Sequence, residues 1–130
     1  MIIAGVGARS AATAAEIVAA VTDCCQRAGV ELAELGQIAG LERSETLASL
    51  RGAAARLNVE LGTITVDRLR NEAHRCVTHS ERAMTALGVP SVAEAAALAA
   101  AGPEGMLLLP RAAFATVTIA LAVGPGGFPS

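Results

Sequence analysis

The sequence predicts an α/β layered domain with a mixed sheet that ends in a β-hairpin. Three strand-like segments, residues 1–6, 35–41 and 61–66, are each followed by a segment with helical periodicity, a pattern typical of layered α/β domains. Near the end, two apolar runs, 106–109 and 116–121, are separated only by a short proline-containing link. This spacing indicates two neighbouring antiparallel strands, so the sheet is not all parallel.

The first helix has clear signals at both ends. Thr13-Ala14-Ala15-Glu16 is a capping-box pattern, in which the Thr13 hydroxyl accepts from the Glu16 N–H and the Glu16 carboxylate reaches back. Apolar residues follow at helical spacing until Gly29, which suits the left-handed conformation that ends many helices.

The later helices are predicted from the same kinds of signal. Ser44 and Asp67 are placed to cap two helices, of which the second extends to about Arg75. Ser80 is placed to cap a short helix that is closed by Gly88. The residues expected to be buried by the helix after Ser44 are Leu47, Leu50, Ala54 and Leu57.

The last helix is alanine-rich and begins with a second capping box. Ser91-Val92-Ala93-Glu94 has the required spacing of hydroxyl and carboxylate, and the helix stops at Gly102. Capping alone is a sufficient role for Glu94. We expect residues 1–123 to form a single domain and residues 124–130, rich in glycine and proline, to form a disordered tail.

Composition excludes several classes of function. Of the 130 residues, 53% are hydrophobic and 17% charged, there is no Trp or Tyr, and the net charge is −2. Stacking on nucleic-acid bases and a basic footprint are both missing, so we expect no nucleic-acid partner. The longest late apolar run is shorter than the roughly 20 residues of a membrane span, so we expect a cytoplasmic protein without a membrane segment.

All ten basic residues are arginine, which restricts the chemistry further. Without lysine the chain has no Schiff-base nucleophile and no P-loop lysine. Anions must instead be held by guanidinium groups, hydroxyls or backbone N–H groups, and arginine suits planar carboxylates because its fork donates two parallel hydrogen bonds. The three cysteines, two of them adjacent, do not predict a disulfide framework.

The opening segment Gly5-Val6-Gly7-Ala8-Arg9 lies between a strand and a helix, where backbone N–H groups favour an anion. A dinucleotide-binding loop would have a third glycine at the position of Ser10. Three interpretations stay open: a nucleotide loop, a plain turn, and a site for another anion with Arg9 as its charged partner. We favour the third.

Further polar residues have competing interpretations. His74, Cys76 and His79 are metal-ligand types, but their spacing matches no familiar closed site, so we expect no metal and no cofactor. His79 beside Ser80 is compatible with nucleophilic catalysis, although binding a carboxylate is the easier role for this histidine. Arg111 is either a solvated hairpin residue or part of an anion site.

Three ordered motifs carry a resemblance to a known family. They are Gly5-Val6-Gly7-Ala8-Arg9, then Gly88-Val89-Pro90-Ser91-Val92-Ala93-Glu94-Ala95-Ala96-Ala97-Leu98, then Leu108-Leu109-Pro110-Arg111 followed by Ala115-Thr116-Val117-Thr118-Ile119-Ala120. Together they resemble the CobE/CbiG C-terminal family of cobalamin biosynthesis over nearly the whole chain. The second motif is the most specific, and residues 42–75 are the least distinctive.

The resemblance implies a three-layer α/β/α fold and a place in making the corrin ring. Two-part members of the family open the δ-lactone of a cobalt-precorrin and release acetaldehyde, whereas this chain looks like the shorter, stand-alone CobE type. The family usually has Cys or Ala before the arginine of the first motif, and here Ala8 precedes Arg9. The chain departs from the family pattern at Leu41-Glu42-Arg43-Ser44-Glu45, where the family often has Asp and Lys.

The resulting expectation is a protein that binds a precorrin or hydrogenobyrinic-acid-like intermediate, as a carrier or as an accessory to another pathway enzyme. The residues expected to bind its carboxylate arms are Gly5, Gly7, Arg9, His79, Ser91 and Arg111. One alternative is a hydrolase that opens a precorrin lactone with Glu94 or His79 as the base. A second alternative is a nucleotide-binding module built on the opening loop.

Overall fold

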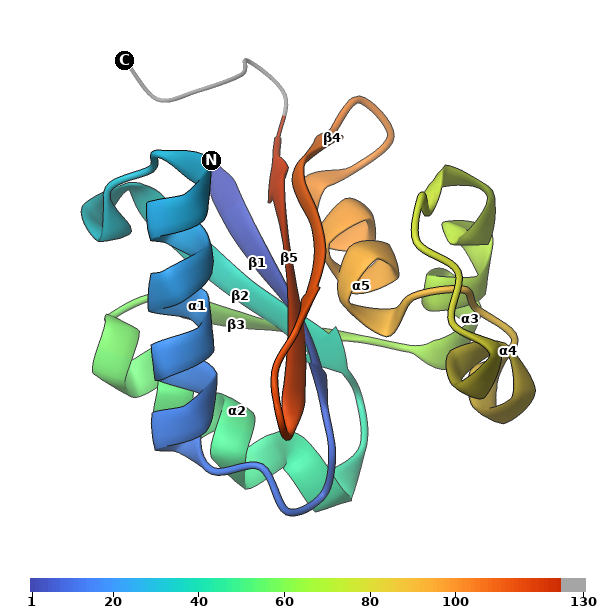
Figure 1. Ribbon diagram of the computed structural model, residues 1–130, viewed down its shortest axis with the longest axis horizontal. Helices are drawn as coiled ribbons and strands as arrows, with labels where there is room; N and C mark the ends of the chain where they lie inside the picture. The colour runs from blue at the N-terminus through green and yellow to red at the C-terminus, as the bar shows by residue number, and fades with distance from the viewer. Residues whose placement is uncertain (125–130) are drawn as a thin grey trace.

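A five-stranded mixed sheet in the order β3-β2-β1-β5-β4 forms the centre of the molecule (Figure 1). In this computed structural model, which describes residues 1–124, β1 is parallel to β2 and β2 to β3, whereas β5 is antiparallel to both β1 and β4. The prediction of a mixed α/β sheet that ends in a hairpin is therefore confirmed. The strands are β1 (Ile2–Ala8), β2 (Leu35–Leu41), β3 (Glu60–Ile64), β4 (Met106–Ala113) and β5 (Val117–Val123).

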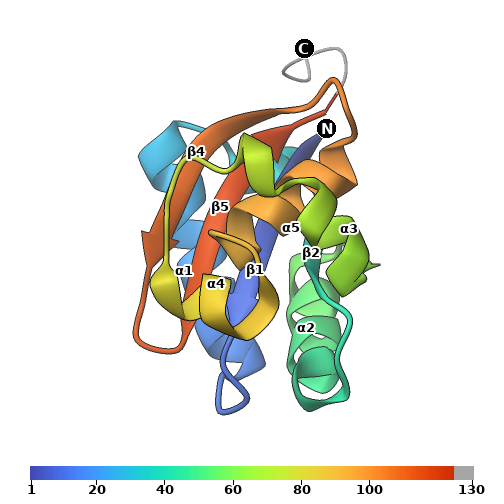
Figure 2. The same cartoon turned by 90° about the vertical axis from the view of Figure 1, so that its right-hand side faces the viewer.

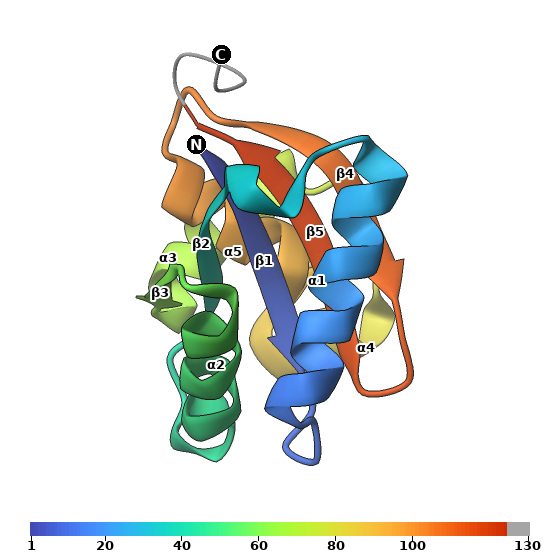
Figure 3. The same ribbon diagram turned by 90° about the vertical axis from the view of Figure 1, so that its left-hand side faces the viewer.

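Helices cover both faces of the sheet, which gives the three layers expected. One face carries α1 and α2, which lie side by side in front of the strands in Figure 3. The other face carries α5, with α3 and α4 further out (Figures 1 and 2). The helices are α1 (Ala14–Ala28), α2 (Ser44–Leu57), α3 (Val66–Asn71), α4 (Glu81–Leu87) and α5 (Val92–Ala101), with short 3₁₀ turns η1 (Leu32–Glu34) and η2 (Ala73–Arg75).

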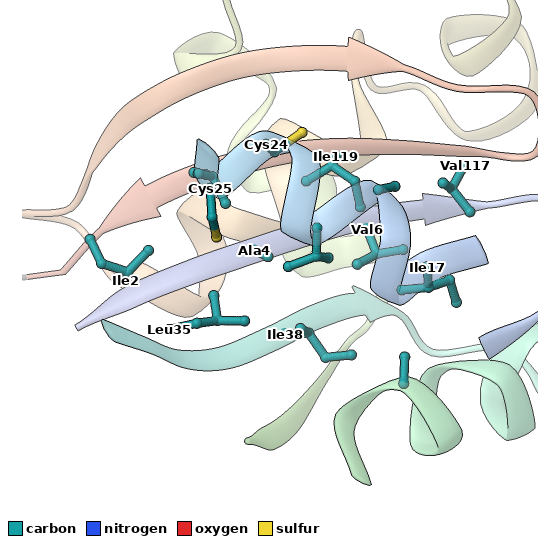
Figure 4. Packing of buried hydrophobic residues seen from close by; sticks show 14 of the residues in the cluster. Ile2, Ala4, Val6, Ile17, Cys24, Cys25, Leu35, Ile38, Val117 and Ile119 are labelled. Atoms are coloured by element: carbon teal, nitrogen blue, oxygen red, sulfur yellow. The ribbon is translucent and has the colours of Figure 1, made fainter. Parts of the chain in front are cut away.

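The core is divided between the two faces because side chains alternate along each strand. Ile2 and Val6 of β1 belong to the cluster under α1 and α2, whereas Ile3 belongs to the cluster under α5. In Figure 4, Ile17 and Cys24 of α1 lie against the strands of the first cluster. Both cysteines of α1 are buried here, where a free thiol packs as a small apolar group.

The second core depends on small residues, which bring α5 very close to β1. A Cβ atom built on Gly5 would lie 2.7 Å from the backbone nitrogen of Ala97, and closer still to the carbonyl oxygen of Ala93. Only glycine leaves room for the helix at this point. Gly5 is therefore a packing residue, and its place in the structure is beneath α5.

The helix signals were correct in part. The Thr13–Glu16 capping box is complete, with hydrogen bonds of 2.9 and 3.1 Å, and Gly29 ends α1 with a φ of 71°. Ser44 was wrongly predicted as a cap, because the N-cap of α2 is Arg43, whose side chain makes no capping bond. Of the residues expected to be buried by α2, Leu50 and Ala54 are buried, and Leu47 and Leu57 are half-buried.

The prediction for α3 was also wrong in its cap and its length. Thr65 is the N-cap, accepting from the backbone N–H of Arg68 at 3.3 Å, because β3 ends at Ile64 and the helix starts earlier than expected. The helix stops at Asn71 and a separate 3₁₀ turn leads to Arg75.

Strand β4 is longer than predicted, and the hairpin link is shorter. The strand continues through Pro110 to Ala113, although proline usually interrupts a sheet. It is tolerated because β4 is an edge strand, and because the pairing with β5 shifts register between Leu109 and Ala112. The predicted tail at 124–130 lies, apart from Gly124, outside the described residues.

Within residues 1–124 no single helix is long and apolar enough to cross a membrane. Helices α4 and α5 reach that length and composition only as a pair bent by 67°.

Candidate functional site

A cleft of about 630 Å³ opens at the carboxyl ends of β1 and β2. Parallel strands end at the same edge of a sheet, so the loops that follow them meet there. The loop after β1, the first turn of α2, helix α4, the start of α5 and the β4–β5 hairpin all contribute to its walls. Helix α4 covers the same end of the sheet as the hairpin turn (Figure 2).

Four arginines line this cleft, and no aspartate or glutamate does, among the residues described. Arg9 follows β1, Arg43 follows β2, Arg82 is in the first turn of α4, and Arg111 is in β4. A single one of them, Arg43, has a carboxylate within 4 Å in the described part of the chain: Glu45, at 3.4 Å. The cleft thus concentrates positive charge in a chain whose net charge is −2.

Several of the other arginines have structural partners. Arg27 pairs with Asp23 at 2.8 Å, and its guanidinium lies 5.3 Å from the ring centre of Phe114. Arg70 donates to the carbonyl of Leu87 at the end of α4, at 2.9 Å.

Arg75 pairs with Glu72 at 2.8 Å and also donates to the carbonyls of Gly102 and Gly105. Such arginines attach α3 and η2 to the ends of neighbouring helices, so they are not free to hold a ligand. Arg9, Arg82 and Arg111 line the cleft, and among residues 1–124 no carboxylate lies within 4 Å of their guanidinium groups.

The rest of the cleft lining is apolar or carries hydroxyl groups. Leu41, Leu87 and Val92 contribute apolar surface, and Thr46 and Ser10 contribute hydroxyls. An apolar lining with a few converging polar groups is the usual form of a small-molecule site. Here the polar groups are mainly guanidinium groups, so the site suits a ligand that has both an apolar body and several carboxylates.

The predicted site residues are divided by the structure. Gly7, Arg9, Ser91 and Arg111 line the cleft. A Cβ atom built on Gly7 would lie 2.5 Å from Thr118 Oγ1, the hydroxyl that donates to the Gly7 carbonyl at 3.4 Å.

The two remaining predicted residues, Gly5 and His79, are not part of the lining. Gly5 lies under α5, and His79 is exposed in the segment before α4. In residues 1–124 no three metal-ligand side chains come together, so His74, Cys76 and His79 do not form a metal site.

Glu94 has a different role from the one predicted by its capping-box pattern. Ser91 Oγ accepts from the Glu94 N–H at 3.2 Å, but the Glu94 carboxylate does not reach back. Instead Oε1 accepts from the backbone N–H groups of Val77 and Thr78, at 2.8 and 3.0 Å, and Oε2 accepts from that of Arg111 at 2.9 Å. The capping box is only half formed, because the carboxylate is used in tertiary contacts.

The Glu94 carboxylate is completely buried and ionised. Burial alone would raise its pKa, but the hydrogen bonds from Arg111, Thr78 and Val77 outweigh that effect and hold the pKa below its usual value. With its side chain at 0% exposure and both oxygens occupied, Glu94 is not positioned to take a proton from a water molecule in the cleft.

The thiols are also poorly suited to nucleophilic chemistry. Burial raises the pKa of Cys24 to about 11 and raises that of Cys25. Burial, assisted by the charge of Glu94, raises the pKa of Cys76 to about 11. All three thiols are free and protonated at neutral pH.

Three residues of the cleft lining, Arg43, Arg82 and Thr46, were not predicted as site residues. Arg43 and Thr46 follow β2, so the rule that parallel strands end at one edge could have placed them beside Arg9. Arg82 lies two residues after the Ser80 cap, but nothing in the local pattern indicates that α4 folds over the cleft. That placement depends on tertiary contacts.

Comparison with known proteins agrees with this architecture. Residues 2–122 match the family model described as "Cobalamin synthesis G C-terminus". No curated protein sequence gives a significant match.

Three solved structures are similar to the chain. The crystal structure of CobE, a protein from the cobalamin (vitamin B12) biosynthetic pathway, is 31% identical with a TM-score of 0.88, covering 94% of this chain and 89% of that one. Cobalamin biosynthesis protein ChiG from Agrobacterium tumefaciens is 34% identical with a TM-score of 0.77, covering 96% and 99%. A cobalamin biosynthesis protein G homologue from Sulfolobus solfataricus is 25% identical with a TM-score of 0.73, covering 93% of this chain but 36% of that one.

The family match covers nearly all of the described chain, and the two structures above 30% identity are similar over almost their whole lengths. The resemblance predicted from the three ordered motifs is therefore confirmed. This chain belongs to the cobalamin synthesis G C-terminal family, and it is a protein of cobalamin biosynthesis.

Proposed function

We propose that the cleft binds a precorrin or hydrogenobyrinic-acid-like intermediate of corrin-ring synthesis through the carboxylates of its side arms. The observation that carries the proposal is the lining of the cleft, which has four arginines and no acidic residue among the residues described. The protein would act as a cytoplasmic carrier of the intermediate, or as an accessory that presents it to another enzyme of the pathway.

The chemistry of such intermediates fits the two kinds of surface in the cleft. They carry acetate and propionate arms around an apolar macrocycle. The arms match the guanidinium groups, and the partly exposed apolar side chains of Leu87 and Val92 are available to the ring. Each hydrogen bond between a guanidinium and a carboxylate contributes about 1.5–3 kcal/mol. Several arms bound at once would give selectivity for a polycarboxylate.

Binding is favoured over opening of a lactone. Of the two candidate bases, the Glu94 carboxylate is buried with both oxygens occupied, and His79 does not line the cleft. A nucleotide is also less favoured, because Ser10 replaces the glycine that a dinucleotide loop requires, and four arginines exceed the need of one pyrophosphate.

The test is a visible-absorbance titration of the purified protein with hydrogenobyrinic acid, with NAD as the comparison ligand. We expect a saturable spectral change with the corrinoid and none with NAD. Arg9→Gln and Arg82→Gln should each weaken binding about tenfold, the loss expected for one charge-assisted contact. Arg51→Gln is the matched control, since Arg51 is exposed on α2 and outside the cleft lining. Equal affinity in all four proteins would contradict the proposal.

A further inference from the structure

We propose that Glu94 is a positioning residue that holds two parts of the cleft lining in place, helix α4 and strand β4. Its carboxylate is hydrogen-bonded to backbone N–H groups of two segments remote in sequence. One is the segment Val77–Thr78, which leads into α4, and the other is β4 at Arg111. The first segment leads to the cleft arginine Arg82 on α4, and the second contains the cleft arginine Arg111.

The contact with β4 compensates for a defect in the sheet. Between Leu109 and Ala112 the register with β5 shifts, and Pro110 has no N–H to donate. The N–H of Arg111 therefore points to α5, where Glu94 Oε2 accepts it at 2.9 Å. The carboxylate takes the place of a neighbouring strand at this point, and it fixes the backbone from which the Arg111 side chain enters the cleft.

The contact with the segment before α4 holds that helix over the cleft. Helix α4 has only seven residues and none of them is buried, so its own packing holds it weakly. Its position depends on the preceding backbone, which is fixed by Glu94 Oε1 at Val77 and Thr78, and by the bond of 2.8 Å from the Ser80 N–H to the Pro90 carbonyl. Arg82 lies within the first turn that follows.

The sequence context supports a dedicated role for this carboxylate. Glu94 is the sole charged residue of α5, whose other nine residues are apolar. Burying an ionised group is costly unless it is hydrogen-bonded, and three backbone N–H donors supply hydrogen bonds to both oxygens. A helix that needed Glu94 only as a cap would leave its carboxylate in solvent.

Two measurements test the inference, and only the second rests on the proposed function. The first uses the free protein, labelled with ¹⁵N. In Glu94→Gln, the backbone amide signals of Val77, Thr78 and Arg111 should move upfield and exchange faster, because the charged acceptor is lost. If Glu94 positions the arginines, the Nε–H signals of Arg82 and Arg111 should also shift or broaden.

The matched control is Glu72→Gln, which removes a partly buried carboxylate whose partner, Arg75, is not in the cleft. It should leave the Nε–H signals of both cleft arginines unchanged. Unchanged arginine signals in Glu94→Gln would overturn the inference. Should Glu94→Gln fail to fold, Glu94→Asp keeps the charge but is too short to reach all three donors, and the same shifts are expected from it.

The second measurement is a double-mutant cycle with hydrogenobyrinic acid as the probe. Glu94→Gln should weaken binding about tenfold in the wild-type background and much less in the Arg82→Ala/Arg111→Ala background, because residues that act through one another are not additive. An equal loss in both backgrounds would indicate a general structural effect and would overturn the positioning role. If the wild type does not bind the probe, the proposed function fails, and the arginine signals of the free protein decide this inference alone.

Discussion

Gly5 provides a sharp test of how this fold is packed, because the sequence motif around it resembles an anion-binding loop. In the structure Gly5 contacts the backbone of α5 instead. We expect the Gly5→Ala substitution to destabilise the protein strongly. The substitution should lower the free energy of unfolding, and it should change the cleft only because α5 moves.

The magnitude follows from the distances. An added Cβ would lie 2.8 Å from Ala97 Cβ, whereas carbon atoms in contact are normally about 3.5–4.0 Å apart. The nearest atoms belong to the helix backbone, so no side-chain rotation relieves the overlap, and α5 must withdraw from the sheet. Overpacking of a core costs about 1–3 kcal/mol. We expect a value at the upper end of that range, since the seven buried residues of α5 move together.

Gly29→Ala is the matched control. Gly29 has a φ of 71° and no atom within 4 Å of an added Cβ, so alanine there is strained but meets no neighbour. That conformation costs an L-residue about 1–2 kcal/mol. Urea unfolding followed by far-ultraviolet circular dichroism compares the free energies of unfolding. The reasoning is refuted if Gly5→Ala is no more destabilising than Gly29→Ala.

Three further predictions concern the caps and the titrating groups. Thr13→Ala removes the hydroxyl that accepts from the Glu16 N–H and should cost about 1 kcal/mol in urea unfolding; no measurable loss would mean that the box contributes nothing. Because hydrogen bonds hold the Glu94 pKa below 4.5, its stabilising contribution is complete above that pH and is lost as the pH falls through the folded value. The stability difference between wild type and Glu94→Gln should therefore shrink below about pH 4.5, and a constant difference would contradict an ionised Glu94. Cys24 is fully buried and its pKa is raised to about 11, so it should react with a thiol reagent at pH 7.5 only as the protein unfolds, and rapid labelling of Cys24 in the native protein would be inconsistent with its environment.

Much of the fold could be predicted because its signals are local. Strand β2 has the predicted bounds, since a short apolar run between polar turns leaves few alternatives. The capping box of α1 is equally local. Strand β4 was predicted too short because proline usually ends a strand, and its tolerance depends on an edge position and a register shift that only the assembled sheet provides.

The site was harder to predict than the fold. Arg9 and Arg111 were identified from motifs at the ends of strands, but Arg82 enters the cleft only because α4 folds over the sheet edge. Glu94 was misinterpreted because its spacing from Ser91 satisfies a local capping rule. One signal was available in the sequence: a lone carboxylate in an otherwise apolar helix has to be buried, and a buried carboxylate needs donors from elsewhere.

The most direct test of the central claim asks whether the arginine-lined cleft recognises carboxylates. Hydrogenobyrinic acid and the same ring with its carboxylates converted to carboxamides should be titrated into the wild-type protein under identical conditions. We expect the free acid to bind at least about tenfold more tightly, since each lost charge-assisted contact is worth about 1.5–3 kcal/mol. Equal binding of the two ligands would show that the four arginines do not recognise the arms, and would contradict the account.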